Sequence, residues 1–548
     1  MKSWSRRRAS ITVFVGLLAF ASAPGLSGST AVPAHPEDKT ILHVLNRIGF
    51  GPRPGDLERV RTIGLEKYID QQLHPENIPD RDLNARLARL STLTMSSRQL
   101  AEDYYVPAMR ARAQARKNAA QAVSPAQAED GKKERTPEQM EAARKQREVV
   151  DELSEQKILR AAFSDRQLEE VMTDFWFNHF NVFAGKGATR MYLTEYERDA
   201  IRPHVLGRFR DLLEATATSP AMLFYLDNWQ SADPNATAGK QFRPFNPRRS
   251  RVMPTPPRSN ATQPTNANNR KRGLNENYGR ELMELHTLGV DGGYTQADVV
   301  AVARCFTGWT IAGPRQGGGF RFEPRMHDPG EKVVLGHTIK AGGEKGDGEK
   351  VLDILAKHPS TARFISTKLV RRFVSDDPPA ALVDRAAARF EATNGDIREV
   401  VRTILTSPEF FAADAYRAKV KTPFEFVVSA VRATASDVSS AVALVQTVRQ
   451  LGMPLYFCQP PTGYADTADA WVNTGALLER MNFALALVNG RMRGVEPPVA
   501  DPSAVTGTLV ASALAGDISP ATASTLARTT DPRQSAALTL GSPEFQRR

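Results

Sequence analysis

Apolar residues recur every three to four positions over most of this chain, and that spacing constrains the fold more than any other feature. The pattern is strong over residues 164–230, 274–311 and 349–500. A period near 3.6 residues places apolar side chains along one face of a helix, whereas a half-buried strand requires strict alternation. The chain is therefore predicted to be all-α: a multi-helix array with long loops and at most a small β-hairpin.

Breaks in this pattern divide the chain into five segments. Residues 1–34 form a leader, and residues 35–230 form an N-terminal helical region. Within that region, residues 110–160 are dominated by Ala, Arg, Lys, Glu and Gln, which predicts an exposed charged helix or hairpin with a break at Asp130-Gly131. Residues 231–272, rich in Pro, Asn, Arg and Thr, are predicted to be a disordered basic insertion. Residues 273–500 form a helical core region with a Gly-rich loop at 312–348, and residues 501–548 form a helical tail.

Short polar motifs indicate where helices begin. Ser407-Pro408-Glu409-Phe410 recurs at 542–545, and Ser219-Pro220 is a partial copy. Serine is a good N-cap residue and proline suits the first helical position, so each copy predicts a helix start. Thr295, with Asp298 three residues later, predicts a capped helix after the glycine turn at 289–293.

The leader has the composition of an export signal. Lys2 and three arginines at 6–8 precede an apolar run at 11–21, which is too short to span a bilayer. Small residues at 21–23 and 29–31 offer cleavage patterns; an uncleaved anchor is the alternative. We expect an exported protein, periplasmic or extracellular, with no transmembrane segment in the mature chain. Export permits a disulfide between Cys305 and Cys458, although their apolar neighbours fit two buried thiols equally well.

The net charge of +11 is concentrated in two segments. The leader carries four basic residues and no acid, and residues 240–272 carry nine basic residues and no acid. The rest of the mature chain is therefore close to neutral. This distribution does not support nucleic-acid binding. The basic segment fits a solvated linker or a tether to an anionic lipid or polysaccharide.

One histidine falls on a face predicted to be buried. In residues 168–183 the apolar stripe comprises Leu168, Met172, Phe175, Trp176 and Phe183. A helical projection places His179 near the middle of that stripe. A buried imidazole must find either a hydrogen-bond partner or a metal. His179 is therefore a satisfied core histidine or a metal ligand.

The helix predicted at 274–288 carries a second polar residue in an apolar stripe. Glu281 falls inside the stripe, and Asn277 and Glu284 stand four residues before it and three after it. These spacings allow the three side chains to converge, while His286 falls near the opposite edge of the stripe.

A carboxylate in an apolar stripe is costly unless it is paired, and such groups are enriched at functional sites. Glu281 is therefore expected either to pair with a core arginine, such as Arg47 or Arg304, or to belong to a functional site.

A further polar stretch contains His327 and Asp328, which fit a polar turn or a loop that supplies metal ligands. Imidazole and carboxylate ligands would suit Zn, Mn or Fe. The candidate metal ligands are His179, Glu281, Glu284, His286, His327 and Asp328. The chain contains no sequence motif of the common hydrolases, proteases, ATPases or dehydrogenases.

Several motifs occur in an order that is characteristic of one bacterial family. The longest is GLNENYGRELMELHTLG at 273–289, followed by DGGYT at 291–295 and FTGW at 306–309. Shorter ones are LNR and FGP at 45–52, FWFNHF at 175–180, LDN at 226–228, WVN at 471–473 and MNF at 481–483. Over about residues 40–490 the chain resembles the family catalogued as domain of unknown function 1800. The basic stretch 240–272 looks like an insertion, and Gly279 stands where a small residue such as Ala is expected.

The resemblance implies an exported, predominantly helical protein. The family has no established activity, so it transfers no catalytic residue. Its members are often encoded beside a second exported family that is similar to sulfatases and alkaline phosphatases. We therefore predict an accessory or interaction partner of another exported, sulfatase-like protein. The alternative is an uncharacterised metal-dependent enzyme, in which His179 and Glu281 would lie within about 6 Å of each other around a shared centre.

Overall fold

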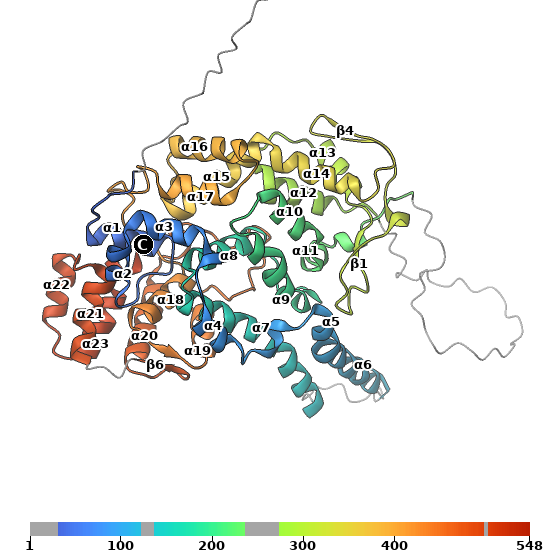
Figure 1. The fold of residues 1–548 in the computed structure, drawn as a ribbon. Coiled ribbons are helices and arrows are strands. Elements are labelled where there is room, and N and C mark those ends of the chain that lie inside the picture. The colour runs from blue at the N-terminus through green and yellow to red at the C-terminus, as the bar shows by residue number, and fades with distance from the viewer. Residues whose placement is uncertain (1–30, 122–135, 236–272, 498–501) are drawn as a thin grey trace, which may run out of the picture.

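The computed structural model describes residues 31–121, 136–235, 273–497 and 502–548. Helices dominate these residues, and strands form only short antiparallel pairs (Figure 1). The all-α prediction is therefore confirmed. The leader, the break at Asp130-Gly131 and the insertion from residue 236 to 272 lie outside the described residues. Across the described ranges, no helix combines the length and the apolar character needed to cross a membrane.

The helices of the first half of the chain cover the predicted N-terminal region. They are α1 (Asp38–Arg47), α2 (Asp56–Ile63), α3 (Leu65–Leu73), α4 (Arg81–Leu87), α5 (Ser97–Leu100), α6 (Val106–Gln121), α7 (Pro137–Phe163), α8 (Gln167–His179), α9 (Leu193–Glu195), α10 (Phe209–Thr218) and α11 (Pro220–Tyr225). The run of Gly and Pro at 49–55 separates α1 from α2, as its composition predicts.

The second half continues the array. Its helices are α12 (Glu276–Met283), α13 (Gln296–Cys305), α14 (Gly346–Lys357), α15 (Pro359–Phe373), α16 (Ala380–Ala392), α17 (Ile397–Leu405), α18 (Pro423–Ala433), α19 (Val442–Gln450), α20 (Thr474–Val488), α21 (Pro502–Leu514), α22 (Pro520–Ala527), α23 (Pro532–Gly541) and α24 (Pro543–Gln546).

Three π-helical turns and several 3-10 turns interrupt or extend these helices. The π-helical turns are η3 (Ala101–Tyr105), η5 (Tyr196–Ile201) and η8 (Glu284–Leu288). The 3-10 turns are η1 (Pro75–Asn77), η2 (Ser91–Thr94), η4 (Thr189–Met191), η6 (Arg202–His204), η7 (Asn228–Gln230), η9 (Pro324–Met326) and η10 (Ala468–Ala470). Single π-helical turns are often found at functional sites, and η8 lies within the longest family motif.

Caps at the predicted positions start several helices. The Thr295 hydroxyl accepts a hydrogen bond from the Asp298 backbone N–H, and the Asp298 carboxylate accepts one from the Thr295 backbone N–H, which completes a capping box at α13. Ser219 and Ser542 cap α11 and α24 and are each followed by proline. At Ser407 the prediction was wrong: the hydroxyl still accepts from the Phe410 backbone N–H at 3.2 Å, but the residues form a turn.

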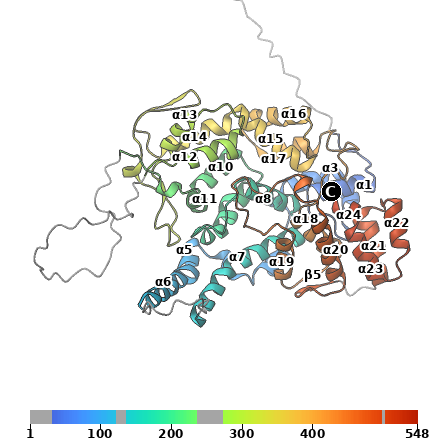
Figure 2. The same cartoon turned by 180° about the vertical axis from the view of Figure 1, so that it is seen from behind.

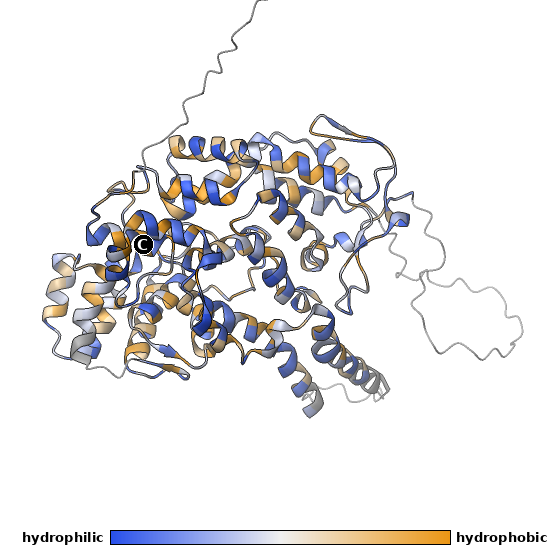
Figure 3. Cartoon of the chain, in the orientation of Figure 1, coloured by the Kyte–Doolittle hydropathy of each residue, from blue (hydrophilic) through white to orange (hydrophobic). Residues whose placement is uncertain are grey.

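Helices α6 and α7 lie side by side and project from the body of the protein (Figures 1 and 2). Their projecting described residues are largely hydrophilic (Figure 3). The prediction that residues 110–160 are exposed holds for most of residues 110–114 and 136–145 but is wrong for the second half of α7. There Val149, Leu153, Ile158 and Leu159 are fully buried, because α8, α18 and α19 pack around that part of the helix.

The Gly-rich segment 312–348 and its flanks hold two small hairpins rather than one. Strand β1 (Trp309–Ile311) pairs with β2 (Phe320–Phe322), and β3 (Lys332–Val334) pairs with β4 (His337–Ile339). A third pair joins β5 (Asp437–Val438) to β6 (Val495–Glu496). Strands of two or three residues carry too little apolar alternation to be read from the sequence.

The end of the chain returns to its beginning. Helices α21–α23 lie beside α1 and α2 at one end of the molecule, and the described chain ends next to them (Figures 1 and 2). Helix α21 contacts α1, and an isolated β-bridge joins Val420 to Arg547. One hydrophobic core runs through the array.

Candidate functional site

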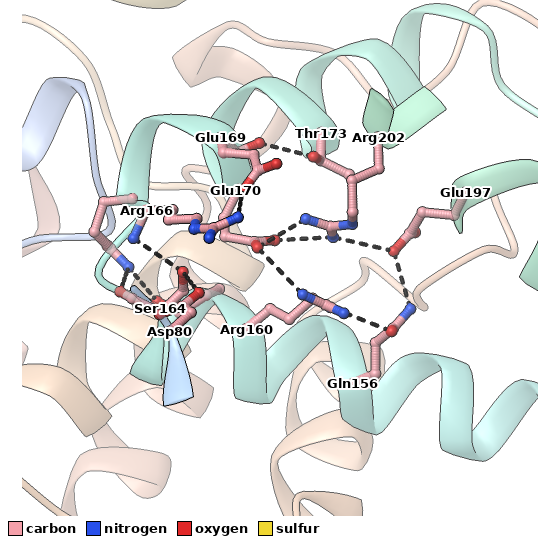
Figure 4. A network of polar contacts seen from close by, with 12 residues as sticks. Asp80, Gln156, Arg160, Ser164, Arg166, Glu169, Glu170, Thr173, Glu197 and Arg202 are labelled. Atoms are coloured by element: carbon pink, nitrogen blue, oxygen red, sulfur yellow. Dashed lines mark hydrogen bonds and ion pairs between the residues drawn. The ribbon is translucent and has the colours of Figure 1, made fainter. Parts of the chain in front are cut away.

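A buried ionic network fixes α8, the helix that carries His179 (Figure 4). Arg202 donates to both oxygens of Glu170, at 2.8 Å and 3.0 Å. Glu197 on η5 accepts from Gln156 Nε2 at 3.1 Å and from the Tyr456 hydroxyl at 2.6 Å. Burial opposes the charge of Arg202, but the two carboxylates raise its pKa. The network joins α7, η5, η6 and the loop at 456 to the first turn of α8, so it fixes the start of this helix.

His179, at the C-terminal end of α8, is buried and uses both ring nitrogens. Its Nδ1 lies 2.9 Å from the Lys368 Nζ, and its Nε2 lies 3.1 Å from the carbonyl oxygen of His286. Because an ammonium group can only donate, Nδ1 accepts and the Nε2–H donates to the carbonyl. Burial, reinforced by the Lys368 charge, lowers the pKa of His179. His179 is thus a hydrogen-bonded core histidine that satisfies a carbonyl at the end of η8.

The π-helical turn η8 explains why His286 is buried. The Thr287 hydroxyl donates to the carbonyl of Leu282, five residues earlier, at 2.7 Å. The wider turn changes the helical phase, so His286 points into the core rather than to the edge of the apolar stripe. Its Nε2 is buried and has no hydrogen-bond partner among the described residues. Burial and the charge of Lys368 lower the pKa of His286 to about 3.

Lys368, on α15, is the residue of this cluster that the sequence analysis missed. It is partly exposed, and its Nζ lies 5.5 Å from the centre of the Phe364 ring. Burial lowers the pKa of Lys368 to about 8. A signal was present in the sequence, because Lys368 stands three residues after the buried Ile365, beside the apolar stripe of α15.

Glu281 and Glu284 form a second cluster on the same motif helix. Glu284 accepts a hydrogen bond from the Tyr294 hydroxyl at 2.8 Å. Glu281 is half-buried and forms no ion pair with the described residues. Burial and the neighbouring Glu284 raise the pKa of Glu281. Asn277 is exposed, and its side chain makes no hydrogen bond within the described part of the chain.

The expected ion pair between Glu281 and a core arginine is wrong. Arg304 binds Asp328 instead, through Nε at 2.7 Å and Nη2 at 3.0 Å. Arg47 donates to the carbonyl of Ala415. The partners of both arginines come from other segments of the chain. A helical projection cannot predict such contacts.

His327 and Asp328 belong to a separate ionic cluster. His327 Nδ1 lies 2.8 Å from the Thr307 carbonyl oxygen, and Nε2 lies 3.2 Å from Asp347 Oδ2. Asp347 also pairs with the buried Lys332 at 2.6 Å. The cluster fastens the β3–β4 hairpin to α13 and α14.

The six candidate ligands therefore fall into distinct groups. The rings of His179 and His286 lie 6.4 Å apart, with Lys368 bonded to His179. Glu281 lies beside Glu284, His327 binds Asp347, and Asp328 binds Arg304. In the described ranges, no three His, Cys, Asp or Glu side chains come together as a metal-binding group. Cys305 and Cys458 are buried free thiols, and burial raises the pKa of each, to about 12 and about 11.

Comparison with known proteins gives one match. A family model described as "Protein of unknown function (DUF1800)" matches residues 43–547. The chain belongs to this family. No curated protein and no solved structure matches it. The longest DUF1800 motif, at 273–289, is thus the α12–η8 helix, where the two glutamates and His286 are placed. The family description names no activity.

Proposed function

We propose that this DUF1800 protein is exported by its N-terminal leader and acts as an interaction partner of another exported, sulfatase-like protein. The proposed binding surface is the outer side of α20, called here the α20 surface: Val472, Leu477, Leu478 and Leu485. One observation carries the proposal. These four side chains are 49%, 48%, 62% and 37% exposed, although they stand within a single short segment.

Three of the four residues share one side of α20. Leu477 and Leu485 are eight residues apart and Leu478 and Leu485 seven, so all three lie within about 100° of the helix circumference. Val472 stands just before the helix. Leucine side chains scattered singly on a surface are ordinary, but a clustered apolar patch indicates a binding surface.

The inner face of α20 is already used. Phe483, Ala484 and Leu487 are buried, and the helix packs against α23. Helix α20 is therefore apolar around most of its circumference, a pattern that is typical of a helix buried on all sides. A partner that covers the outer face would complete that burial.

The test measures binding of a purified, exported sulfatase-like protein from the same organism. Leu478→Glu and Leu485→Glu place a charge in the surface and should weaken binding at least tenfold. Val290→Glu and Val333→Glu, also at exposed apolar positions but away from α20, serve as matched controls and should bind like the wild type. Wild-type protein that does not bind, or α20 variants that bind normally, would overturn the proposal. Light scattering identifies self-association through the same surface.

A second candidate function is supported by the cluster at η8. Lys368 is partly exposed, holds a pKa of about 8, and bonds to His179, while Glu281 and Glu284 offer carboxylates on the adjoining helix. Groups that titrate near neutral pH can transfer protons. This candidate is an enzyme that uses Lys368 as an acid or base.

A thermal-shift screen of small metabolites tests this second candidate. A compound that stabilises the wild type but not Lys368→Met would support it, and a screen with no such compound would contradict it. Elemental analysis of the wild type beside Glu281→Ala tests the metal-dependent version. Stoichiometric Zn, Mn or Fe that the substitution removes would make Glu281 a ligand.

A further inference from the structure

Arg47, the last residue of α1, is completely buried and lacks a counter-ion among the described residues. Its side chain is 0% exposed. Nη2 donates to the Ala415 carbonyl at 2.5 Å, but Nε and Nη1 have no partner in the described part of the chain. A guanidinium keeps its charge in proteins, so it cannot escape this environment by losing a proton. An unpaired buried charge is strongly destabilising unless something compensates it.

Two neighbours leave further polar atoms unpaired at the same place. His43, one turn before Arg47, has its Nε2 2.8 Å from the Phe410 carbonyl oxygen, while its buried Nδ1 has no partner among the described residues. Arg548 is also buried. Its Nε and Nη2 lie 3.1 Å and 3.6 Å from Glu425 and Asp466 but form no hydrogen bond with them.

The charges of these groups act on one another's pKa values, which shows that the groups lie close together. Burial, followed by the charges of Arg548 and Arg372, lowers the pKa of Arg47. Burial, followed by the charge of Arg47, lowers the pKa of His43. The unpaired atoms of Arg47, His43 and Arg548 therefore belong to one buried region, in which positive charge is in excess.

The acids nearby are already engaged. Glu425 binds both Arg372 and Arg548, Asp376 binds Lys419, and Asp466 is shared by Lys419 and Arg548. Arg372, Arg548 and Lys419 thus share these three side-chain carboxylates. Arg47 lies within ion-pair distance of none of them.

We propose that Arg47 and Arg548 form a buried binding site for one small inorganic anion, a halide or an oxyanion such as phosphate or sulfate. The anion accepts hydrogen bonds from Nε or Nη1 of Arg47 and from Nη2 of Arg548. It supplies the negative charge that the carboxylates do not. Ordered water could fill the hydrogen bonds but would not balance the charge.

The site would also join distant parts of the chain. Arg47 and His43 come from α1, whereas Arg548 follows α24. The anion would therefore stabilise the contact between the first and last helices of the array.

The experiment has two readouts on the full chain. Ion chromatography after denaturation of extensively dialysed protein measures the anion released per chain. Thermal melting at constant ionic strength compares chloride, phosphate and sulfate with gluconate, an anion too large for a buried site. We expect one equivalent of anion to be released, or a melting temperature that rises with the concentration of one small anion.

Variants separate this site from general salt effects. Arg47→Met should remove both the released anion and the specific dependence on anions, leaving only the general effect of salt. Arg202→Met is the matched control, because it removes a largely buried arginine that is paired with the carboxylates of Glu170 and Glu197. This variant should lose stability yet retain the anion. If Arg47→Met fails to fold, Arg548→Met takes its place. No released anion together with equal melting in all salts, or an Arg47→Met protein that still binds the anion, would overturn the proposal.

Discussion

The ion pair between Lys332 and Asp347 should contribute strongly to stability. The Lys332 side chain is 0% exposed and that of Asp347 is 1% exposed, with 2.6 Å between Nζ and Oδ2. Asp347→Ala leaves the ammonium in the core, with the carboxylate of Asp328 4.0 Å away and the backbone carbonyl of the same residue as its remaining acceptor. Stranding one member of a buried pair costs about 3–5 kcal/mol. We expect that loss in the free energy of unfolding.

A double variant tests the reasoning behind this number. Lys332→Met combined with Asp347→Leu removes both charges and fills the space with apolar groups, which is often neutral or stabilising. The double variant should therefore be more stable than Asp347→Ala alone. Asp384→Ala breaks the exposed pair with Arg363 and should cost no more than about 0.5 kcal/mol.

Urea unfolding followed by circular dichroism at pH 7 measures all three proteins. An Asp347→Ala protein that loses less than about 1 kcal/mol would refute the argument from burial. A double variant less stable than the single one would show that packing, rather than the stranded charge, dominates at this position.

Three further predictions concern the motif helix and its contacts. Burial and the charge of Lys368 lower the pKa of His286 to about 3, so this residue contributes stability above pH 6.5 that is lost as the pH falls toward 3. His286→Phe should lose less stability than the wild type when urea midpoints at pH 7 and pH 4.5 are compared. Equal losses in both proteins would contradict this prediction. Burial and the charge of Glu284 raise the pKa of Glu281, so the protein disfavours the charged form of this residue above pH 4.5. Glu281→Gln should therefore slightly raise the melting temperature at pH 7. A lower melting temperature would contradict this prediction. A Cβ atom on Gly279 would stand 2.8 Å from the Val299 carbonyl oxygen. Gly279→Val should therefore lower the free energy of unfolding in urea by about 1–3 kcal/mol. An unchanged urea midpoint would show that α12 can move away from α13.

Helix positions could be predicted because their signals are local. Thr295 and Asp298 are three residues apart, and each satisfies the other's backbone. The run of Gly and Pro between α1 and α2 prevents a helix at the positions where these residues stand. The failure at Ser407 shows the limit, because the hydroxyl forms its expected bond while the residues after it form turns rather than a helix.

The arrangement of the polar residues could not be predicted in the same way. The burial of His179 followed from helical phase, but its partners, Lys368 and the His286 carbonyl, come from segments more than a hundred residues away. His286 was misplaced because the π-helical turn at η8 changes the phase on which the projection depends. The pairing of Arg304 with Asp328 rather than Glu281 was set by how the hairpins fold over α13, which no spacing in the sequence reports.

The contact between the two ends of the array also has a consequence for the order of folding. Arg547 pairs with Val420, and the backbone of Lys421 donates to the carbonyl of Gln546 at 2.9 Å. Helix α1 contacts α21, so the core around α1 includes residues that lie far later in the chain. Contacts at such long sequence separation form slowly, and partly folded chains expose apolar surface until these contacts have formed. The core around α1 should therefore be among the last parts of the fold to form, and refolding of this chain should improve with a chaperone that shields apolar surface.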